Sequence, residues 1–207
     1  MGGMFDPVHA GHINAARLAF TNLGLERVLL LPCGSPVHRE AAVTPASHRI
    51  AMLQLIADEE NWLQVDTREC DSPQPSWTWH STVSIGRDHP ESLLFLIMGM
   101  DSLLSLPGWY RWQDLLDRVN TVVIARPGFI LDMAVVQPQL REALGKRLVS
   151  VARMQEADNA GNMVLLDGAE VEASSSALRN RLASRQLANL QLHPAVQQYI
   201  TSNGLYR

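Results

Sequence analysis

The sequence lacks the features of secreted, membrane-embedded and nucleic-acid-binding proteins. It has two cysteines in 207 residues. Because Cys33 and Cys70 lack the paired spacing of a zinc site or redox motif, we expect them to be buried, reduced and inert in a cytoplasmic protein. No apolar run approaches the roughly 20 residues of a membrane-spanning helix, and residues 1–7 lack the basic and apolar regions of a signal peptide. The net charge of −4 excludes an overall positive field for nucleic acid or an anionic membrane.

The sequence also has no repeat, linker or low-complexity tract. Hydrophobic residues make up 46% of the chain and charged residues 18%, which excludes collagen-like and disordered classes. A globular chain of this length fits one domain. We therefore expect a single domain over residues 1–207, with a C-terminal helical portion at about 174–207.

Short apolar runs alternate with amphipathic stretches. Strands are expected at 28–32, 93–98, 122–125 and 163–166. Helices are expected at 13–23, 45–60 with Thr44 as N-cap, 79–88, 109–118, 139–148, 175–184 and 194–203. Continuous apolar strands between helices indicate a parallel sheet with helices on both faces, because such strands are buried on both sides. The expected fold class is α/β, Rossmann-like, in which ligands bind beyond the carboxyl ends of the strands.

The chain opens with Gly2-Gly3-Met4-Phe5-Asp6-Pro7-Val8-His9-Ala10-Gly11-His12 and continues into a helix. His9 and His12 are three residues apart at the helix start, so they face the same way. Their ring N–H groups add to the free backbone donors and the positive dipole end of the helix, which together suit a phosphate. Gly11 leaves the approach open. The alternatives are surface histidines in a glycine-rich turn, or a metal pair.

This motif resembles the N-terminal signature of the nucleotidylyltransferase superfamily, and specifically that of the bacterial nicotinate-nucleotide adenylyltransferases. The resemblance implies that His9 and His12 are catalytic, binding ATP phosphates and stabilising the transition state at the α-phosphorus. It also implies ATP-binding roles for Gly2, Gly3, Phe5 and Gly11. The family places a buried strand before the glycines, and this sequence has only Met1 there. Either the start of the sequence was assigned late, or the sheet lacks an expected strand of about five or six residues.

A serine cluster precedes the helix expected at 175–184. Hydroxyls and free N–H groups at a helix start, with an arginine one turn further on, can hold phosphate groups. The alternative is a capped amphipathic helix. The segment resembles the family's I-S-S-T-x-I-R motif on the β/γ-phosphate side of ATP, which assigns ATP binding to Ser174, Ser175, Ser176 and Arg179.

A glycine and a carboxylate follow the strand expected at 93–98. Gly99 allows close approach of a ligand at the strand end, and the Asp101 carboxylate can accept both hydroxyls of a ribose. Asp101 could equally cap the next turn. The family has a similar G-x-D-S segment, which implies that both residues bind ATP.

Other segments resemble those with which the family selects its substrate. Thr78 matches the threonine of a P-S-Y-T segment, with Ser76 as the expected helix cap, and Trp109 and Tyr110 match an aromatic segment that stacks on the pyridine ring. Trp112 is expected in the core instead. His38 and Arg39 match a basic loop, and Arg126 matches an R-P-G segment that meets the mononucleotide phosphate.

The resemblance implies attack by the phosphate of nicotinate mononucleotide on the α-phosphorus of ATP, giving deamido-NAD and pyrophosphate. Such a phosphate needs no general base, because it is largely dianionic at neutral pH. Mg²⁺ is expected to be carried with ATP, with no metal held by the protein. Alternatives are another nucleotidylyltransferase, such as a pantetheine-phosphate adenylyltransferase or a cytidylyltransferase, a non-catalytic nucleotide sensor, and a hydrolase using His9 and His12 as metal ligands. The oligomeric state stays open.

Overall fold

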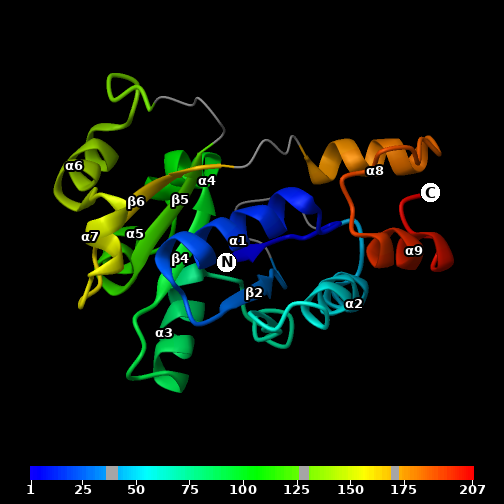
Figure 1. Cartoon of the computed structure of the whole chain (residues 1–207), viewed down its shortest axis with the longest axis horizontal. Coiled ribbons are helices and arrows are strands. Elements are labelled where there is room, and N and C mark those ends of the chain that lie inside the picture. The colour runs from blue at the N-terminus through cyan, green and yellow to red at the C-terminus, as the bar shows by residue number, and fades with distance from the viewer. Residues whose placement is uncertain (36–41, 126–130, 169–172) are drawn as a thin grey trace. The chain divides into compact units, whose positions relative to one another are not determined.

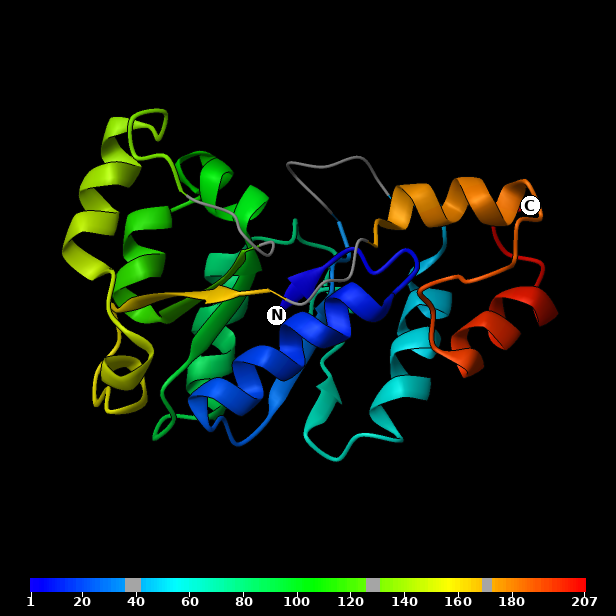
Figure 2. The same cartoon turned by 45° about the horizontal axis from the view of Figure 1, so that its top comes forward.

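A computed structural model describes residues 1–35, 42–125, 131–168 and 173–207 (Figures 1 and 2). The chain forms two compact units. Unit 1 comprises Met1–Arg17, Glu26–Ser76 and Val171–Arg207, and unit 2 comprises Leu18–Leu25 and Trp77–Glu170. Within the described residues, no helix is both long and apolar enough to cross a bilayer.

Strands and helices alternate along the chain, as the apolar pattern predicts. The strands are β1 (Gly2–Gly3), β2 (Val28–Pro32), β3 (Leu63–Val65), β4 (Phe95–Gly99), β5 (Asn120–Ala125) and β6 (Met163–Asp167). The helices are α1 (Ala10–Leu23), α2 (Ala46–Ala57), α3 (Thr78–Asp88), α4 (Met100–Ser105), the 3₁₀ turn η1 (Leu106–Gly108), α5 (Trp112–Arg118), α6 (Pro138–Arg147), α7 (Val151–Gln155), α8 (Ser175–Ala183) and α9 (Pro194–Ser202).

Unit 1 contains a parallel sheet in the order β1-β2-β3. The first strand has two residues, Gly2 and Gly3, which pair with Leu31 and Pro32 of β2. The backbone N–H of Leu31 also donates to the Met1 carbonyl over 2.9 Å. The glycines of the motif therefore form a short parallel strand beside β2.

Helices α2 and α9 pack together in unit 1, and α2 also packs on β2 and β3 (Figure 1). Buried apolar side chains of α2 lie at helical spacing, at Met52, Leu53 and Ile56. Arg49 occupies the same buried face, which is unusual because an arginine is rarely buried without polar partners. Its partners belong to the site described below.

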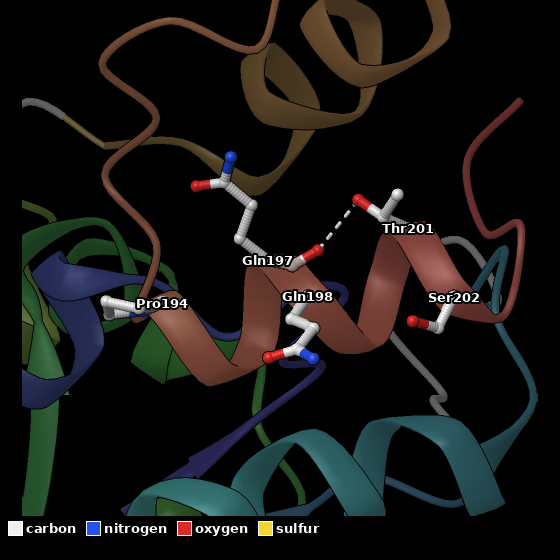
Figure 3. Close-up of a pocket in the computed structure, with 5 residues that line it drawn as sticks. All are labelled: Pro194, Gln197, Gln198, Thr201 and Ser202. Carbon is white, nitrogen blue, oxygen red and sulfur yellow. Dashed lines mark hydrogen bonds between the residues drawn. The ribbon is translucent and has the colours of Figure 1, made fainter.

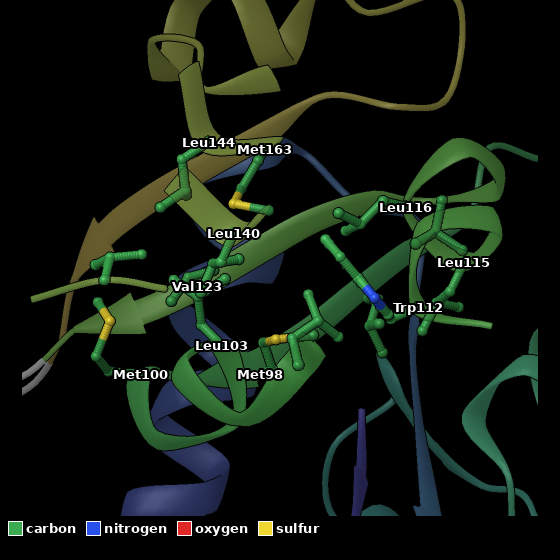
Figure 4. Close-up of a cluster of buried hydrophobic side chains, with 14 of the residues drawn as sticks. Met98, Met100, Leu103, Trp112, Leu115, Leu116, Val123, Leu140, Leu144 and Met163 are labelled. Carbon is green, nitrogen blue, oxygen red and sulfur yellow. The ribbon is translucent and has the colours of Figure 1, made fainter. Parts of the chain in front are cut away.

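Unit 2 contains a parallel sheet in the order β4-β5-β6, with β5 in the centre. Every residue of β5 except Ile124 is buried, as expected for a central parallel strand. Side chains from the sheet, α4, α5 and α6 form one apolar cluster (Figure 4). Trp112 is part of this cluster, which confirms its expected place in the core.

The observed helix starts correct several predicted ones, and α1 begins at Ala10, three residues before the predicted position 13. The helix predicted at 109–118 begins only at Trp112, because Arg111 adopts a left-handed backbone with φ of 53°. Trp109 and Tyr110 therefore lie before the helix. The N-cap of α2 is Pro45 and not Thr44, which places the helix start at Ala46. The sequence pattern did not reveal β3, α4 or α7.

The cysteines are free thiols, as expected, but they are half-buried and not fully buried. The Cys70 thiol donates to the Pro32 carbonyl over 3.1 Å. Burial raises the pKa of both thiols. Because the thiolate is the reactive form, a raised pKa disfavours reaction of either thiol at neutral pH.

Candidate active site

The loop from β1 to α1 has a compact shape that depends on its glycines. Phe5 is buried, and its backbone is left-handed with φ of 50°. A Cβ on Gly3 would lie 3.1 Å from the Phe5 ring. A Cβ on Gly11 would lie 3.0 Å from Nδ1 of His9. The glycines therefore let one aromatic ring and one imidazole pack directly against backbone.

The two motif histidines form a stacked pair. Their ring centroids are 3.7 Å apart and their planes differ by 29°. The backbone N–H of His9 donates to Nδ1 of His12 over 3.3 Å. Since Nδ1 accepts this bond, a neutral His12 ring carries its proton on Nε2. The loop therefore turns His12 into a hydrogen-bond donor at Nε2.

His9 is the buried member of the pair, with 6% of its surface exposed. Burial lowers the pKa of His9 to about 4 from its ordinary value of 6.5. Its Nδ1 atom has no hydrogen-bond partner among the described residues. His9 is therefore a neutral imidazole at neutral pH, and it supplies shape and hydrogen bonding without a formal charge.

This burial predicts a loss of stability in acid that depends on His9. The unfolded chain binds a proton at the ordinary pKa of 6.5, whereas folded His9 resists protonation down to about pH 4. Lowering the pH through this window should therefore favour unfolding, by roughly 3 kcal/mol at most. Denaturant unfolding at pH 7 and pH 5 measures this slope. The slope should shrink in His9→Gln and persist in the exposed control His89→Gln; equal slopes in all three proteins would contradict the assignment.

The motif also contains a buried carboxylate. Asp6 is 2% exposed. Its Oδ2 atom accepts the backbone N–H groups of Val43 at 2.7 Å and Thr44 at 3.3 Å, and its Oδ1 atom accepts the Tyr206 hydroxyl at 2.6 Å. Both carboxylate oxygens therefore bind donors of the protein itself. The sequence reasoning missed this residue, although it lies inside the motif.

Arg49 joins three backbone segments around the same loop. It is 2% exposed, and its guanidinium donates to the carbonyls of Thr44 at 3.1 Å, Met4 at 2.8 Å and Cys33 at 2.9 Å. The sequence reasoning missed Arg49 as well. A signal was present, because it is three, four and seven residues before the buried positions of α2.

The start of α8 contacts the histidine loop. The Ser175 hydroxyl donates to the Pro7 carbonyl over 3.0 Å, and Arg179 donates to the Asp6 carbonyl over 2.7 Å. Arg179 also donates to the Ser176 hydroxyl over 3.2 Å. Ser174 is the N-cap, and its hydroxyl accepts the backbone N–H of Ala177. Unit 1 thus brings both ATP motifs predicted from the sequence to one place.

Unit 2 contains the residues that the sequence predicts to bind the ribose of ATP and the pyridine ring of the acceptor. Gly99 ends β4 and is the N-cap of α4, so Asp101 lies in the first turn and does not cap it. A Cβ on Gly99 would meet nothing within 4 Å. Thr78 is the first residue of α3. Trp109 packs partly against the apolar cluster of unit 2, so much of its ring is in contact with protein.

Tyr110 is the more accessible aromatic side chain of this segment, with 45% of its surface exposed. Its ring centroid lies 5.2 Å from that of Trp77 and 5.6 Å from that of His80. His80 lies in α3, Trp77 is the N-cap of α3, and Tyr110 lies just before α5. An exposed aromatic group of this kind offers a flat surface to a planar ligand.

Some predictions are corrected or lie outside the described residues. Ser76 does not cap α3, whose N-cap is Trp77. Its hydroxyl instead accepts the backbone N–H groups of Gly34 and Ser35, each at 3.1 Å. The remaining predicted residues, His38, Arg39 and Arg126, lie outside the described residues.

A surface hollow of about 420 Å³ lies along α9 (Figure 3). Its lining residues are Pro194, Gln197, Gln198, Thr201 and Ser202. None of the described site residues predicted from the sequence lines it. Over residues 1–35, 42–125, 131–168 and 173–207, no three His, Cys, Asp or Glu side chains cluster as metal ligands would.

Comparisons with known proteins agree with this geometry. Residues 1–181 match the family described as cytidylyltransferase-like. A probable nicotinate-nucleotide adenylyltransferase of Aeromonas hydrophila is 39% identical, with 100% of this chain and 95% of the relative covered. A protein of the same name from Pseudoalteromonas atlantica is 35% identical, with 100% and 93% covered.

A solved structure confirms the fold class. Nicotinic acid mononucleotide adenylyltransferase of Plasmodium falciparum, complexed with NaAD, superposes with a TM-score of 0.70 and 17% sequence identity. The match covers 99% of this chain and 94% of that one. The expected Rossmann-like α/β fold is therefore confirmed.

Proposed function

The chain belongs to the cytidylyltransferase-like family, among the nicotinate-nucleotide adenylyltransferases, and we propose that it transfers the adenylyl group of ATP to nicotinate mononucleotide. The products are deamido-NAD and pyrophosphate, and the reaction belongs to NAD biosynthesis. The observation that carries this proposal is the stacked His9–His12 pair, whose loop accepts two hydrogen bonds from the serine-led helix α8.

Catalysis of this reaction consists of positioning two anions and stabilising the charge that develops between them. The Nε2–H of His12 donates to an oxygen of the α-phosphate, where negative charge increases in the transition state. His9 fixes the orientation of His12 through the ring stack and its backbone N–H. The phosphate of the acceptor attacks in line, and pyrophosphate leaves on the opposite side.

The start of α8 is proposed to hold the β- and γ-phosphates. Arg179 has N–H donors beyond those bound to Asp6 and Ser176, so a phosphate can be accommodated. The hydroxyls of Ser174, Ser175 and Ser176 lie on the first turn of the helix or at its cap. Gly2, Gly3, Phe5 and Gly11 are proposed to shape the ATP side of the loop.

Mg²⁺ is proposed to accompany ATP, held by phosphate oxygens and water. The donor set of the loop supports this, because Asp6 uses both carboxylate oxygens for Val43, Thr44 and Tyr206. When bound, the ion neutralises part of the triphosphate charge. The imidazoles and the guanidinium supply hydrogen bonds to the same phosphates.

Residues of unit 2 are proposed to bind ATP and the acceptor. Asp101 would accept the ribose hydroxyls beside Gly99. Thr78, Trp109 and Tyr110 would bind the nicotinate ring and its carboxylate, with most of the exposed aromatic surface on Tyr110. His38, Arg39 and Arg126 are proposed to meet phosphate groups of the substrates. We further propose that residues 1–207 act as one cytoplasmic nucleotidylyltransferase domain, with a C-terminal helical portion at about 174–207.

Offering ATP and Mg²⁺ with either nicotinate or nicotinamide mononucleotide tests this proposal. We expect kcat/KM to be at least tenfold higher for the nicotinate form, measured by pyrophosphate release. A strong preference for the amide would contradict the assignment of the acceptor. Activity only with a pantetheine phosphate or with CTP would indicate another nucleotidylyltransferase. Pyrophosphate release without an acceptor would indicate a hydrolase, and no release at all would indicate a nucleotide sensor.

A further inference from the structure

Tyr206 and Asp6 form a buried polar pair to which the reaction above assigns no chemical step. Their side chains are joined by a hydrogen bond of 2.6 Å across 200 residues of sequence. A buried carboxylate is costly unless its oxygens are hydrogen-bonded. The nearby arginines have no described hydrogen bond to this carboxylate, because Arg49 and Arg179 donate to backbone carbonyls. Asp6 therefore depends on neutral donors, and Tyr206 supplies the only side-chain donor among the described residues.

The hydroxyl of Tyr206 is held as a donor. Burial, followed by the hydrogen bond to Asp6, raises the pKa of Tyr206 well above its ordinary value. The proton therefore stays on the tyrosine oxygen, and the bond is the short, charge-assisted type that a carboxylate accepts. Tyr206 also adopts a left-handed backbone with φ of 60°, which a tyrosine rarely does without compensating contacts.

Asp6 connects this bond to the loop that carries the histidines. Its carboxylate holds the backbone at Val43 and Thr44, and its own carbonyl accepts Arg179. The next carbonyl, that of Pro7, accepts Ser175, and His9 follows two residues later. A displacement of Asp6 would therefore move the peptide units that set the positions of His9 and α8.

We propose that Tyr206 is a positioning residue for adenylyl transfer, fixing the Asp6 carboxylate and through it the loop that aims His9 and His12 at the phosphates. This inference rests on the proposed function for its kinetic effect only. Its structural content, that the Tyr206 hydroxyl fixes the loop and the backbone at 43–44, holds for any reaction at this site. In this proposal Tyr206 acts through Asp6 and not by contact with the substrate or the reacting atoms.

The test compares Tyr206→Phe with Tyr199→Phe. Tyr199 is a matched control, because its hydroxyl also makes one side-chain hydrogen bond in the C-terminal segment, to Nδ1 of His48 at 2.9 Å. We expect Tyr206→Phe to lower kcat about tenfold or more, with KM for ATP changed less than threefold, because small displacements of catalytic groups mainly slow the chemical step. Tyr199→Phe should keep the wild-type kcat. Both variants should fold, and Tyr206→Phe should melt at the lower temperature, because the buried Asp6 carboxylate loses a donor.

A second readout needs no substrate. In amide NMR spectra, Tyr206→Phe should shift the N–H signals of Val43 and Thr44, which donate to the same carboxylate, and Tyr199→Phe should leave them in place. The effects of Tyr206→Phe and Asp6→Asn on kcat should be non-additive in a double-mutant cycle, because both changes affect the same hydrogen bond between residues 6 and 206.

The outcomes separate this inference from the proposed function. Equal kcat and unshifted amide signals in Tyr206→Phe would overturn the positioning role, whatever reaction the wild-type protein performs. Failure of Tyr206→Phe to fold, with a folded Tyr199→Phe, would overturn it in favour of a purely structural role. Shifted amide signals in Tyr206→Phe, together with a wild-type protein that shows no adenylyl transfer, would support the loop contact and reject the proposed function.

Discussion

Replacing His12 with alanine is expected to lower kcat by a factor of 10² or more, with a smaller effect on the affinity for ATP. The proposed contact of Nε2–H with the α-phosphate strengthens as charge develops in the transition state. Removing one such donor typically costs 10²–10³ in turnover. The proposed ground-state contacts with ATP are spread over α8 and the loop, so the affinity should change much less. Single-turnover rates and equilibrium binding of ATP measure the two effects separately.

Two further variants sharpen this prediction. His12→Gln retains an N–H donor near the position of Nε2, so it should keep more activity than the alanine variant. The exposed control His89→Ala, at the C-cap of α3, should leave kcat unchanged. Unaltered turnover in His12→Ala would remove this histidine from the mechanism.

Replacing Gly34 with alanine is expected to destabilise the protein by about 3 kcal/mol, through a clash with backbone. A Cβ at this position would lie 2.0 Å from the Glu69 carbonyl oxygen and 2.7 Å from its carbon, far below the 3.0 Å that real Cβ contacts observe. The opposing segment is held in place, because Cys70 donates its backbone N–H to Thr67 and its thiol to Pro32. Neither side can move without losing hydrogen bonds.

Thermal unfolding measures this effect. For a chain of this size, about 3 kcal/mol corresponds to a fall in Tm of roughly 6–12 °C. The matched control is Gly145→Ala, in the interior of α6, where an added Cβ would meet nothing within 4 Å. That variant should be more stable than wild type by about 0.5–1 kcal/mol, because alanine favours a helix over glycine. An unchanged Tm in Gly34→Ala would show that the two segments are not in contact.

Continuous apolar strands were the most predictable elements. The run at 28–32 coincides with β2, because a central parallel strand needs apolar side chains on both faces and leaves a clear signal. The starts of α8 and α9 were also predictable from a serine cap and a proline in the first turn. Short elements such as β3, with three residues, offer too little pattern to recognise.

The start of α5 could not be predicted, because a specific set of side-chain contacts determines it. Arg111 takes a left-handed backbone that arginine disfavours. Its guanidinium donates to Asp114 over 2.6 Å and lies 4.1 Å from the ring centre of Trp79, which compensates the strain. Helix propensity alone predicts a continuous helix from Trp109, and it misses this tertiary compensation.

The candidate site also contains some residues that the sequence predicts and others that it does not. The residue types at His9, His12 and Arg179 indicate phosphate chemistry from the sequence, and the family resemblance brings them together. The supporting contacts are not readable, because Asp6 bonds to residues 37 and 200 positions away. No local pattern encodes such distant pairs. A charged residue at a core position, as at Arg49, is the one sequence signal that would have pointed to them.

Two hydrogen bonds within the protein compete with the proposed phosphate ligand for the guanidinium of Arg179. The Asp6 carbonyl and the Ser176 hydroxyl occupy guanidinium donors that an arriving phosphate would also seek. Where the proposed phosphate displaces either bond instead of using the remaining N–H groups of Arg179, the measured affinity would be the difference between the bonds gained and those lost. On release of pyrophosphate in the proposed reaction, the same two acceptors would bind the guanidinium again, so such an exchange would weaken binding and also ease product dissociation.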